Sequence, residues 1–130
     1  MEMAREGVEL ALGMKNDPQY GPIIMIAAGG ILVELLDDHT SELAPLSEKR
    51  AIDMLNRLKI AKLLESVRGR PARDKQALVK LIVRFSQIAH ELADGIAEID
   101  LNPVIVHTSG CTSVDALIVP QKSAVSQQNA

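Results

Sequence analysis

Hydrophobic and polar positions divide the chain into strands, then helices, then strands again. At residues 8–14 every second side chain is apolar, which predicts a half-buried strand. Residues 16–19, Asn-Asp-Pro-Gln, are typical of a turn. The continuous apolar run at residues 22–28 predicts a strand covered on both faces, and residues 31–36 predict a third strand after Gly29 and Gly30.

The middle of the chain has helical spacing. Ser47 is a candidate N-cap for a helix whose apolar positions recur every three or four residues: Ala51, Met54, Leu55 and Leu58. A shorter helical segment is expected at residues 60–64 and ends before Gly69 and Pro71. Asp74 is expected to cap a longer helix with one broad apolar stripe: Leu78, Leu81, Ile82, Phe85, Ile88, Ala89 and Leu92.

The C-terminal region alternates once more. Residues 97–102 predict a strand, residues 104–106 continue it after Pro103, and residues 108–110 predict a turn into a return strand at residues 114–119. This order predicts an α+β fold, with a mostly antiparallel sheet covered by helices. Residues 120–130, rich in Ser, Gln and Asn, are expected to form a flexible tail.

Composition narrows the class of protein. A chain of 130 residues with 47% hydrophobic residues is one domain or part of one. Cys111 is the only cysteine, which excludes an internal disulfide and a cysteine-based zinc site.

The most apolar stretch, residues 22–36, is shorter than the roughly 20 residues that a bilayer requires. The N-terminal residues are acidic where a signal peptide would be basic, so we expect no membrane association and a cytoplasmic location.

Charge is distributed unevenly along the chain. The net charge of −3 conceals a middle segment, residues 48–84, with eleven basic and four acidic residues, a net of +7. This segment forms either solvated helix faces or a surface that meets phosphates or an acidic partner. Nucleic acid is not an expected partner, because the whole chain is acidic and Tyr20 and Phe85 are its only aromatic residues.

The strand at residues 97–102 carries the candidate chemistry. Alternation places Glu98, Asp100 and Asn102 on one face, and a hairpin register would bring Asp115 beside them. Two carboxylates about 4 Å apart repel each other by roughly 1 kcal/mol in water and ~4 kcal/mol at a protein surface. Carboxylate and amide oxygens suit Mg²⁺ or Mn²⁺ and not zinc. A solvated polar face is the alternative.

Other chemistry-bearing residues form no recognisable constellation. His39 falls in an expected loop, His90 on the last helix and His107 beside a turn, and none shows the spacing of a catalytic triad or a metal site. Cys111 has no evident base partner, so a free thiol is expected. Gly29 and Gly30 indicate either a tight turn or a close approach of the backbone to a ligand or partner. The basic loop at residues 68–73 either holds phosphate or is a solvated linker.

Three segments in order resemble a known family. They are GVELALGMKNDPQYGPIIMIAAGGILVELLDD, LAPLSEKRAIDMLNRLKIAKLLESVRGRPARD, and IAEIDLNPVIV followed by SVDALIV. They resemble the C-terminal half of the ATP-grasp domain of NDP-forming acyl-CoA synthetases and, more distantly, the β subunit of succinyl-CoA synthetase. The resemblance covers residues 3–119 and departs from the family at Ala27, Ser66 and Leu117. It implies that residues 1–119 are the second half of an ATP-grasp domain.

The resemblance also implies a site and a reaction. The positions that match Asn102 and Asp115 hold the magnesium of ATP in the family, and Asp100 belongs to the same site. The family converts an acid, CoA and ATP to acyl-CoA, ADP and phosphate through a phosphorylated histidine on a CoA-binding domain or subunit. The first half of the ATP-grasp domain and that CoA-binding part are then the expected partners. This chain would then form only one side of the ATP site, and it is expected to be inactive on its own.

Two alternatives remain open from the sequence. One is a non-catalytic regulatory module, of the kind fused to protein acetyltransferase domains. The other is a fragment whose exposed half-interface forms a homodimer.

Overall fold

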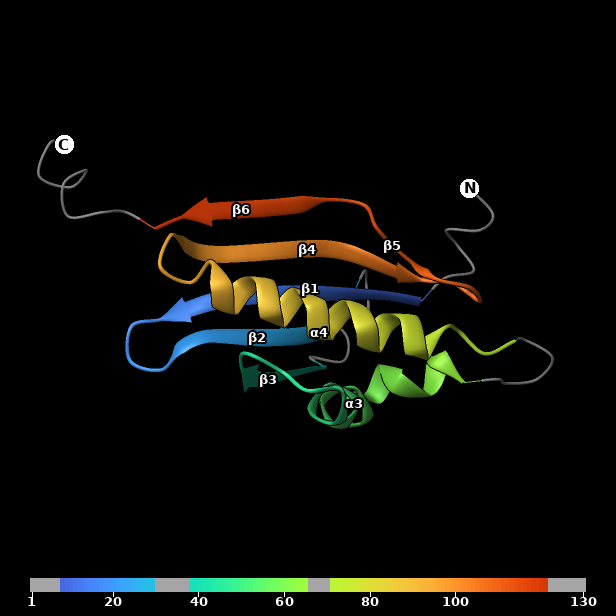
Figure 1. Ribbon diagram of the computed structural model, residues 1–130. Coiled ribbons are helices and arrows are strands. Elements are labelled where there is room, and N and C mark those ends of the chain that lie inside the picture. Colours follow the sequence, from blue (N-terminus) through green and yellow to red (C-terminus); the bar gives the residue numbers. More distant parts are fainter. Residues whose placement is uncertain (1–7, 30–37, 66–70, 122–130) are drawn as a thin grey trace, which may run out of the picture.

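The computed structural model describes residues 8–29, 38–65 and 71–121. Its strands form one antiparallel sheet in the order β3-β2-β1-β4-β5, and β6 pairs with β4 on the same side as β5 (Figure 1). The strands are β1 (Val8–Asp17), β2 (Gly21–Ala28), β3 (His39–Leu43), β4 (Ile96–Val106), β5 (Cys111–Ser113) and β6 (Ala116–Pro120). The helices are α3 (Glu48–Asn56), the 3-10 helix η1 (Lys59–Leu64) and α4 (Lys75–Glu91).

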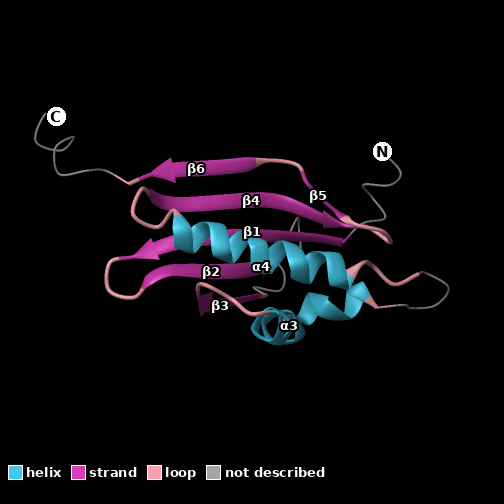
Figure 2. Ribbon diagram, in the orientation of Figure 1, coloured by secondary structure: helices cyan, strands magenta, loops and turns pink. Residues whose placement is uncertain are grey.

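The helices gather on one face of the sheet, as the sequence predicted. Figure 2 shows α4 lying over the sheet, roughly along the direction of the strands, with α3 beside it. The core between α4 and the sheet contains fully buried Leu10, Leu12, Ile24, Ile26, Leu78 and Ile82. The expected α+β fold with a mostly antiparallel sheet is therefore confirmed. Within the described residues no helix combines the length and apolar character needed to cross a bilayer.

Both predicted helix caps are present. The Ser47 hydroxyl accepts a hydrogen bond from the Arg50 N–H at 3.2 Å, and the Asp74 carboxylate accepts one from the Ala77 N–H at 3.0 Å. Each cap supplies an acceptor to a backbone N–H that the first helical turn leaves unpaired. These short-range contacts fix where α3 and α4 begin.

Two strand predictions differ from the structure. Residues 22–28 were expected to be covered on both faces, but Met25 is 44% exposed while Ile24 and Ile26 are fully buried. The reason is that the helices cover only one side of β2. Residues 31–36, expected as a strand, lie outside the described residues. The strand β3 begins at His39, which was expected in a loop, because its sequence His-Thr-Ser-Glu-Leu shows little apolar alternation.

A carboxylate connects the start of β3 to η1. Asp38 is 6% exposed and accepts hydrogen bonds from the Lys59 N–H at 2.8 Å and the Ile60 N–H at 2.7 Å. Burial of this charge is offset by these two donors at the start of the 3-10 helix. Asp38 thereby fixes the helical layer against the edge of the sheet.

The strand β4 runs without interruption through Pro103, and it contains a bulge. Leu12 pairs with Leu101 but Leu10 pairs with Val104, so β4 has one extra residue at Asn102 and Pro103 relative to β1. The return strand predicted at residues 114–119 is found as β6, which begins two residues later at Ala116. A short additional strand, β5, precedes Val114 and Asp115.

Candidate metal centre

Asn102 and Asp115 lie across from each other where the return segment passes the bulge. The Asn102 N–H donates to the Asp115 carbonyl at 3.3 Å, and the Val114 N–H donates to the Pro103 carbonyl at 3.1 Å. This continues by one residue the register in which Leu101 pairs with Ala116. Residues directly opposite in an antiparallel pair present their side chains on the same face. Both polar side chains are exposed.

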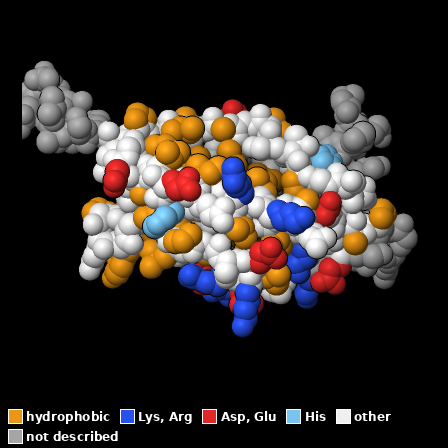
Figure 3. All heavy atoms as spheres, viewed as in Figure 1, with side chains coloured by type: hydrophobic (Ala, Val, Ile, Leu, Met, Phe, Trp, Pro, Cys, Tyr) orange, Lys and Arg blue, Asp and Glu red, His pale blue; other side chains and the backbone are white. Residues whose placement is uncertain are grey.

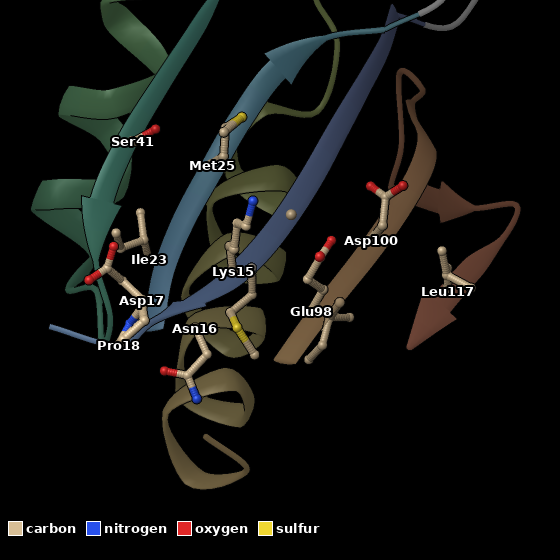
Figure 4. A pocket seen from close by; sticks show the side chains of 13 residues that line it. Lys15, Asn16, Asp17, Pro18, Ile23, Met25, Ser41, Glu98, Asp100 and Leu117 are labelled. Carbon is tan, nitrogen blue, oxygen red and sulfur yellow. The ribbon is translucent and has the colours of Figure 1, made fainter. Parts of the chain in front are cut away.

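Asp100 lies two residues before Asn102 on the face that the helices leave open. Figure 4 shows its carboxylate directed away from the sheet, on the same side as Glu98. It lines a cavity of about 480 Å³ that extends along β1 and β2 to the turn after Asp17. Directly opposite Asp100 on β1 is Gly13, which has no side chain to fill the space above the strand.

The cavity is mixed in character. Lys15 on β1 pairs in register with Glu98 on β4, so a cation and a carboxylate are neighbours on the open face. Apolar side chains, among them Met25 and Leu117, line the same cavity. Leu117 is one of the positions at which the sequence departs from the family pattern, and it lies opposite Asp100. The mixture suits a ligand with an apolar part and a charged part.

The donor set fits a hard divalent cation. Asp100, Asn102 and Asp115 offer two carboxylates and one amide oxygen. One Asp115 oxygen accepts the Ala116 N–H at 2.9 Å, while Asp100 accepts no hydrogen bond from the residues that the structure describes. In residues 8–29, 38–65 and 71–121 no group of three or more His, Cys, Asp or Glu is placed to hold a metal ion. The ligands beyond these oxygens would be water and phosphate, which is typical of Mg²⁺ sites in proteins.

His90, His107 and Cys111 are not among the candidate ligands. His107 Nε2 lies 3.0 Å from the Thr112 hydroxyl, on the β4–β5 turn, and His90 is in the last turn of α4. Burial raises the pKa of the Cys111 thiol to about 11, and the Asp74 carboxylate contributes in the same direction. The thiol is therefore protonated at neutral pH and is a poor nucleophile.

Gly29 makes a close backbone approach within the fold. Its N–H donates to the Glu9 carbonyl at 2.9 Å, and a Cβ at Gly29 would lie 3.0 Å from that carbonyl's carbon and oxygen atoms. The close neighbour of Gly29 is the backbone of β1 within the fold. The approach to a ligand or partner that the sequence left open is not tested by this contact. Gly30 and residues 68–70 of the basic loop lie outside the described residues.

Sequence reasoning missed the cavity that adjoins the candidate ligands. Gly13, Lys15, Met25 and Ser41 come from three strands, and only the register brings them together. One signal was available, because alternation along residues 8–14 leaves Gly13 on the face opposite the core residues. The position of β3 carried no such signal.

These features agree with one family of proteins. The chain matches the ATP-grasp domain family over residues 1–119 and belongs to that family. The resemblance inferred from the three sequence segments is confirmed.

The similar proteins include ADP-forming acid–CoA ligases. The chain is 42% identical over 120 residues to the 4-hydroxybutyrate–CoA ligase (ADP-forming) of Nitrosopumilus maritimus, covering 91% of this chain and 17% of that protein. It is 39% identical over 119 residues to subunit beta of acetate–CoA ligase (ADP-forming) II of Pyrococcus furiosus, covering 90% of this chain and 50% of that subunit.

A solved structure agrees with the fold and also contains a nucleotide. This is the dinucleotide-forming acetyl-coenzyme A synthetase 1 of Candidatus Korarchaeum cryptofilum, in complex with coenzyme A and Mg-AMPPCP. It matches with a TM-score of 0.82 and 43% identity, covering 88% of this chain and 54% of that chain. The chain thus spans about half the length, or less, of the relatives it matches.

Proposed function

We propose that this chain forms one wall of the Mg-ATP site of an ADP-forming acid–CoA ligase. Asp100, Asn102 and Asp115 are the proposed metal ligands. The observation that carries the proposal is the cross-strand position of Asn102 and Asp115, beside a strand that presents Asp100 on the open face. The Mg-AMPPCP complex of the Korarchaeum synthetase, 43% identical, supports a nucleotide and a divalent cation as ligands. Mn²⁺ has the same preference for oxygen and is an alternative metal.

The chemistry of the site follows from its charges. A bound divalent cation would offset the negative charge of the ATP phosphates, which is the main electrostatic demand of phosphoryl transfer. Asp100 and Asp115 would hold that cation by charge, and the Asn102 amide would add a neutral ligand. Lys15 lies on the same face and can contact phosphate oxygens beyond the metal. These residues bind and orient, and we assign none of them a nucleophilic role.

The rest of the reaction belongs to parts outside this chain. In the proposed assembly residues 1–119 form the second half of the ATP-grasp domain. Pro120, which was expected to begin a tail, instead completes β6 by pairing with Ile96. The first half supplies the opposite wall, and a CoA-binding domain or subunit supplies the phosphohistidine. The Korarchaeum structure, which contains a phosphohistidine segment pointing towards its nucleotide site, supports this division. Acid, CoA and ATP are the proposed substrates, and acyl-CoA, ADP and phosphate the products.

The regulatory alternative has no comparable support. The curated relatives named above are ligases, and no described residue favours a purely regulatory role. We therefore put forward only the ligase assignment.

The test is a double substitution in the full-length protein that contains this chain. We expect Asn102→Ala with Asp115→Ala to lower acyl-CoA formation at least a hundredfold and to weaken Mn²⁺ binding measured by electron paramagnetic resonance. A matched control is Asn56→Ala with Asp53→Ala, which removes the same two groups from the exposed side of α3. Full activity in the Asn102 and Asp115 variant would show that these side chains do not hold the metal.

A further inference from the structure

The two flanks of α4 differ in what lies beside them. On one flank Gln76, Val79 and Lys80 line a groove with α3. Helical spacing places Leu81, Ile88 and Leu92 on the opposite flank, since they are seven and four residues apart and turned away from Val79. Figure 1 shows α3 on one side of α4 and the strands β4 and β6 on the other. Ile88 and Leu92 therefore face the β6 side, and they are 37% and 46% exposed.

The strand β6 presents an apolar side chain to the same region. Ile118 pairs with Ile99, so both side chains are on the helix-covered face of the sheet. Ile99 is 7% exposed beneath the helical layer, whereas Ile118 is 56% exposed. The difference arises because α4 packs against β1, β2 and β4, while β6 lies beyond β4, at the edge of the sheet away from α4 (Figure 1).

Ile88, Leu92 and Ile118 are thus exposed apolar side chains on the helix-covered side of the sheet, and we call them together the α4–β6 surface. Figure 3 shows hydrophobic side chains gathered over β4 and β6 beside α4, whereas Lys, Arg, Asp and Glu gather mainly toward α3. The residues of β6 include no charged side chain, of the kind that prevents an exposed edge strand from pairing with another chain. An apolar area of this kind marks an interaction site when a partner of matching shape exists.

We propose that the α4–β6 surface is the docking site for an amphipathic helix from the part of the parent protein that this chain does not contain. The Pyrococcus furiosus subunit is matched over 50% of its length, so it has about as much polypeptide again outside the matched region. A helix packed beside α4, with about 8–10 Å between the two axes, would place apolar side chains against Ile88 and Leu92 on α4. Other side chains of its apolar stripe would cover Ile118 on the sheet. Helices are the usual cover for the apolar face of such a sheet.

A second copy of the chain is a poorer fit. Pairing two β6 strands edge to edge would extend the sheet in its own plane. Ile88 and Leu92 lie on α4, above that plane, and would stay exposed to water. The proposal depends on membership of the family and is independent of the metal ligands, because the α4–β6 surface is on the face opposite Asp100. The missing polypeptide would then contact this chain on both faces of the sheet.

The test uses the half of the Pyrococcus furiosus subunit beta that this chain does not match, co-expressed with the tagged chain. We expect a one-to-one complex in size-exclusion chromatography, with slowed amide hydrogen exchange in β6 and in the C-terminal half of α4. Ile88→Lys with Ile118→Lys should weaken the complex at least tenfold. The matched control is Ile52→Lys with Leu43→Lys, a helix and a strand residue with 37% and 43% exposure on the α3 side.

Three results of the binding experiments would overturn the proposal. They are the absence of a complex with the unaltered chain, equal weakening by both pairs of substitutions, and a chain that elutes as a dimer disrupted by Ile118→Lys. Circular dichroism and a thermal melt establish that each variant is folded. The hydrogen-exchange measurement needs no substitution, so it tests the docking site even if a variant unfolds. Protection confined to the open face would also contradict the proposal.

Discussion

At the scale of single residues, Asp74 connects three parts of the fold. Its carboxylate accepts hydrogen bonds from the Ala77 N–H at 3.0 Å and from the Gly110 N–H at 2.7 Å. Its own N–H donates to the His107 carbonyl at 2.7 Å. One side chain therefore caps α4 and also holds the turn between β4 and β5. The hydrogen bond from Gly110, and then that from Ala77, lower the pKa of Asp74 below its usual value of 3.8.

This lowered pKa predicts how stability depends on pH. Because the folded-state pKa is below the unfolded one, Asp74 stabilises the fold above the unfolded value of 3.8, and that contribution disappears as the pH falls through the folded value. We expect the melting temperature of the unaltered chain to fall more between about pH 5 and about pH 3 than that of Asp74→Asn. Circular dichroism melts across this range measure the difference.

The control for this prediction is Asp53→Asn, an exposed aspartate on α3 whose carboxylate makes no hydrogen bond to a described residue. It should keep the pH dependence of the unaltered chain. If Asp74→Asn kept it as well, the hydrogen bonds of Asp74 would not contribute to acid sensitivity.

At the scale of elements, the backbone after β2 lies in close contact with β1 because Gly29 has no side chain. A Cβ at Gly29 would meet backbone atoms of Glu9 and Leu10 at 3.0–3.1 Å. Backbone within a paired strand cannot move aside as a flexible side chain can. We expect Gly29→Ala to lower the free energy of unfolding by about 1–3 kcal/mol, the usual cost of forcing an extra methyl into a packed site. Urea unfolding followed by circular dichroism measures it.

Gly13→Ala is the matched control within the same pair of strands. The nearest atom to a Cβ there is the Ile99 carbonyl oxygen at 3.7 Å, which is ordinary contact. The expected change in unfolding free energy is within about 0.5 kcal/mol. Equal losses for the two substitutions would mean that steric conflict with β1 is not the cause.

The elements that sequence predicted well are those fixed by local chemistry. Ser47 and Asp74 cap their helices, and alternation placed Leu10, Leu12 and Ile99 in the core, because each signal acts over a few neighbouring residues. The predicted stripe on α4 was wider than the buried one. Ile88 belongs to it by spacing but is exposed, because burial depends on how far the sheet extends beneath the helix.

Long-range pairing explains what the sequence did not reveal. The bulge at Asn102 exists only relative to β1, and β3 forms because β2 offers it an edge. The candidate ligands were accessible from the sequence because spacing of two on one strand and a short hairpin are local features. The cavity beside them was not, since Lys15, Ser41 and Glu98 come from strands far apart in the chain. The metal assignment itself stays a prediction.

At the scale of the whole molecule, one side of the sheet is packed and the other is open. The candidate ligands lie on or beside the open face, where Asp100 borders the cavity and Asn102 and Asp115 are exposed. An exposed carboxylate acts in a high dielectric, so its attraction for a metal cation is weak. A second wall would exclude water and strengthen the same contacts without any change in these residues.

The last prediction follows from this one-sided arrangement. Holding reactants in position contributes about 7–11 kcal/mol to catalysis in a closed site, and a single open wall cannot provide that positioning. We expect the isolated 130-residue chain to form no detectable acyl-CoA from acetate, CoA and Mg-ATP, measured by thiol consumption and by ADP release. The intact Pyrococcus furiosus ligase serves as the positive control. Turnover by the isolated chain that disappeared with Asn102→Ala would refute this dependence on a second wall, because the open face would then hold a complete site.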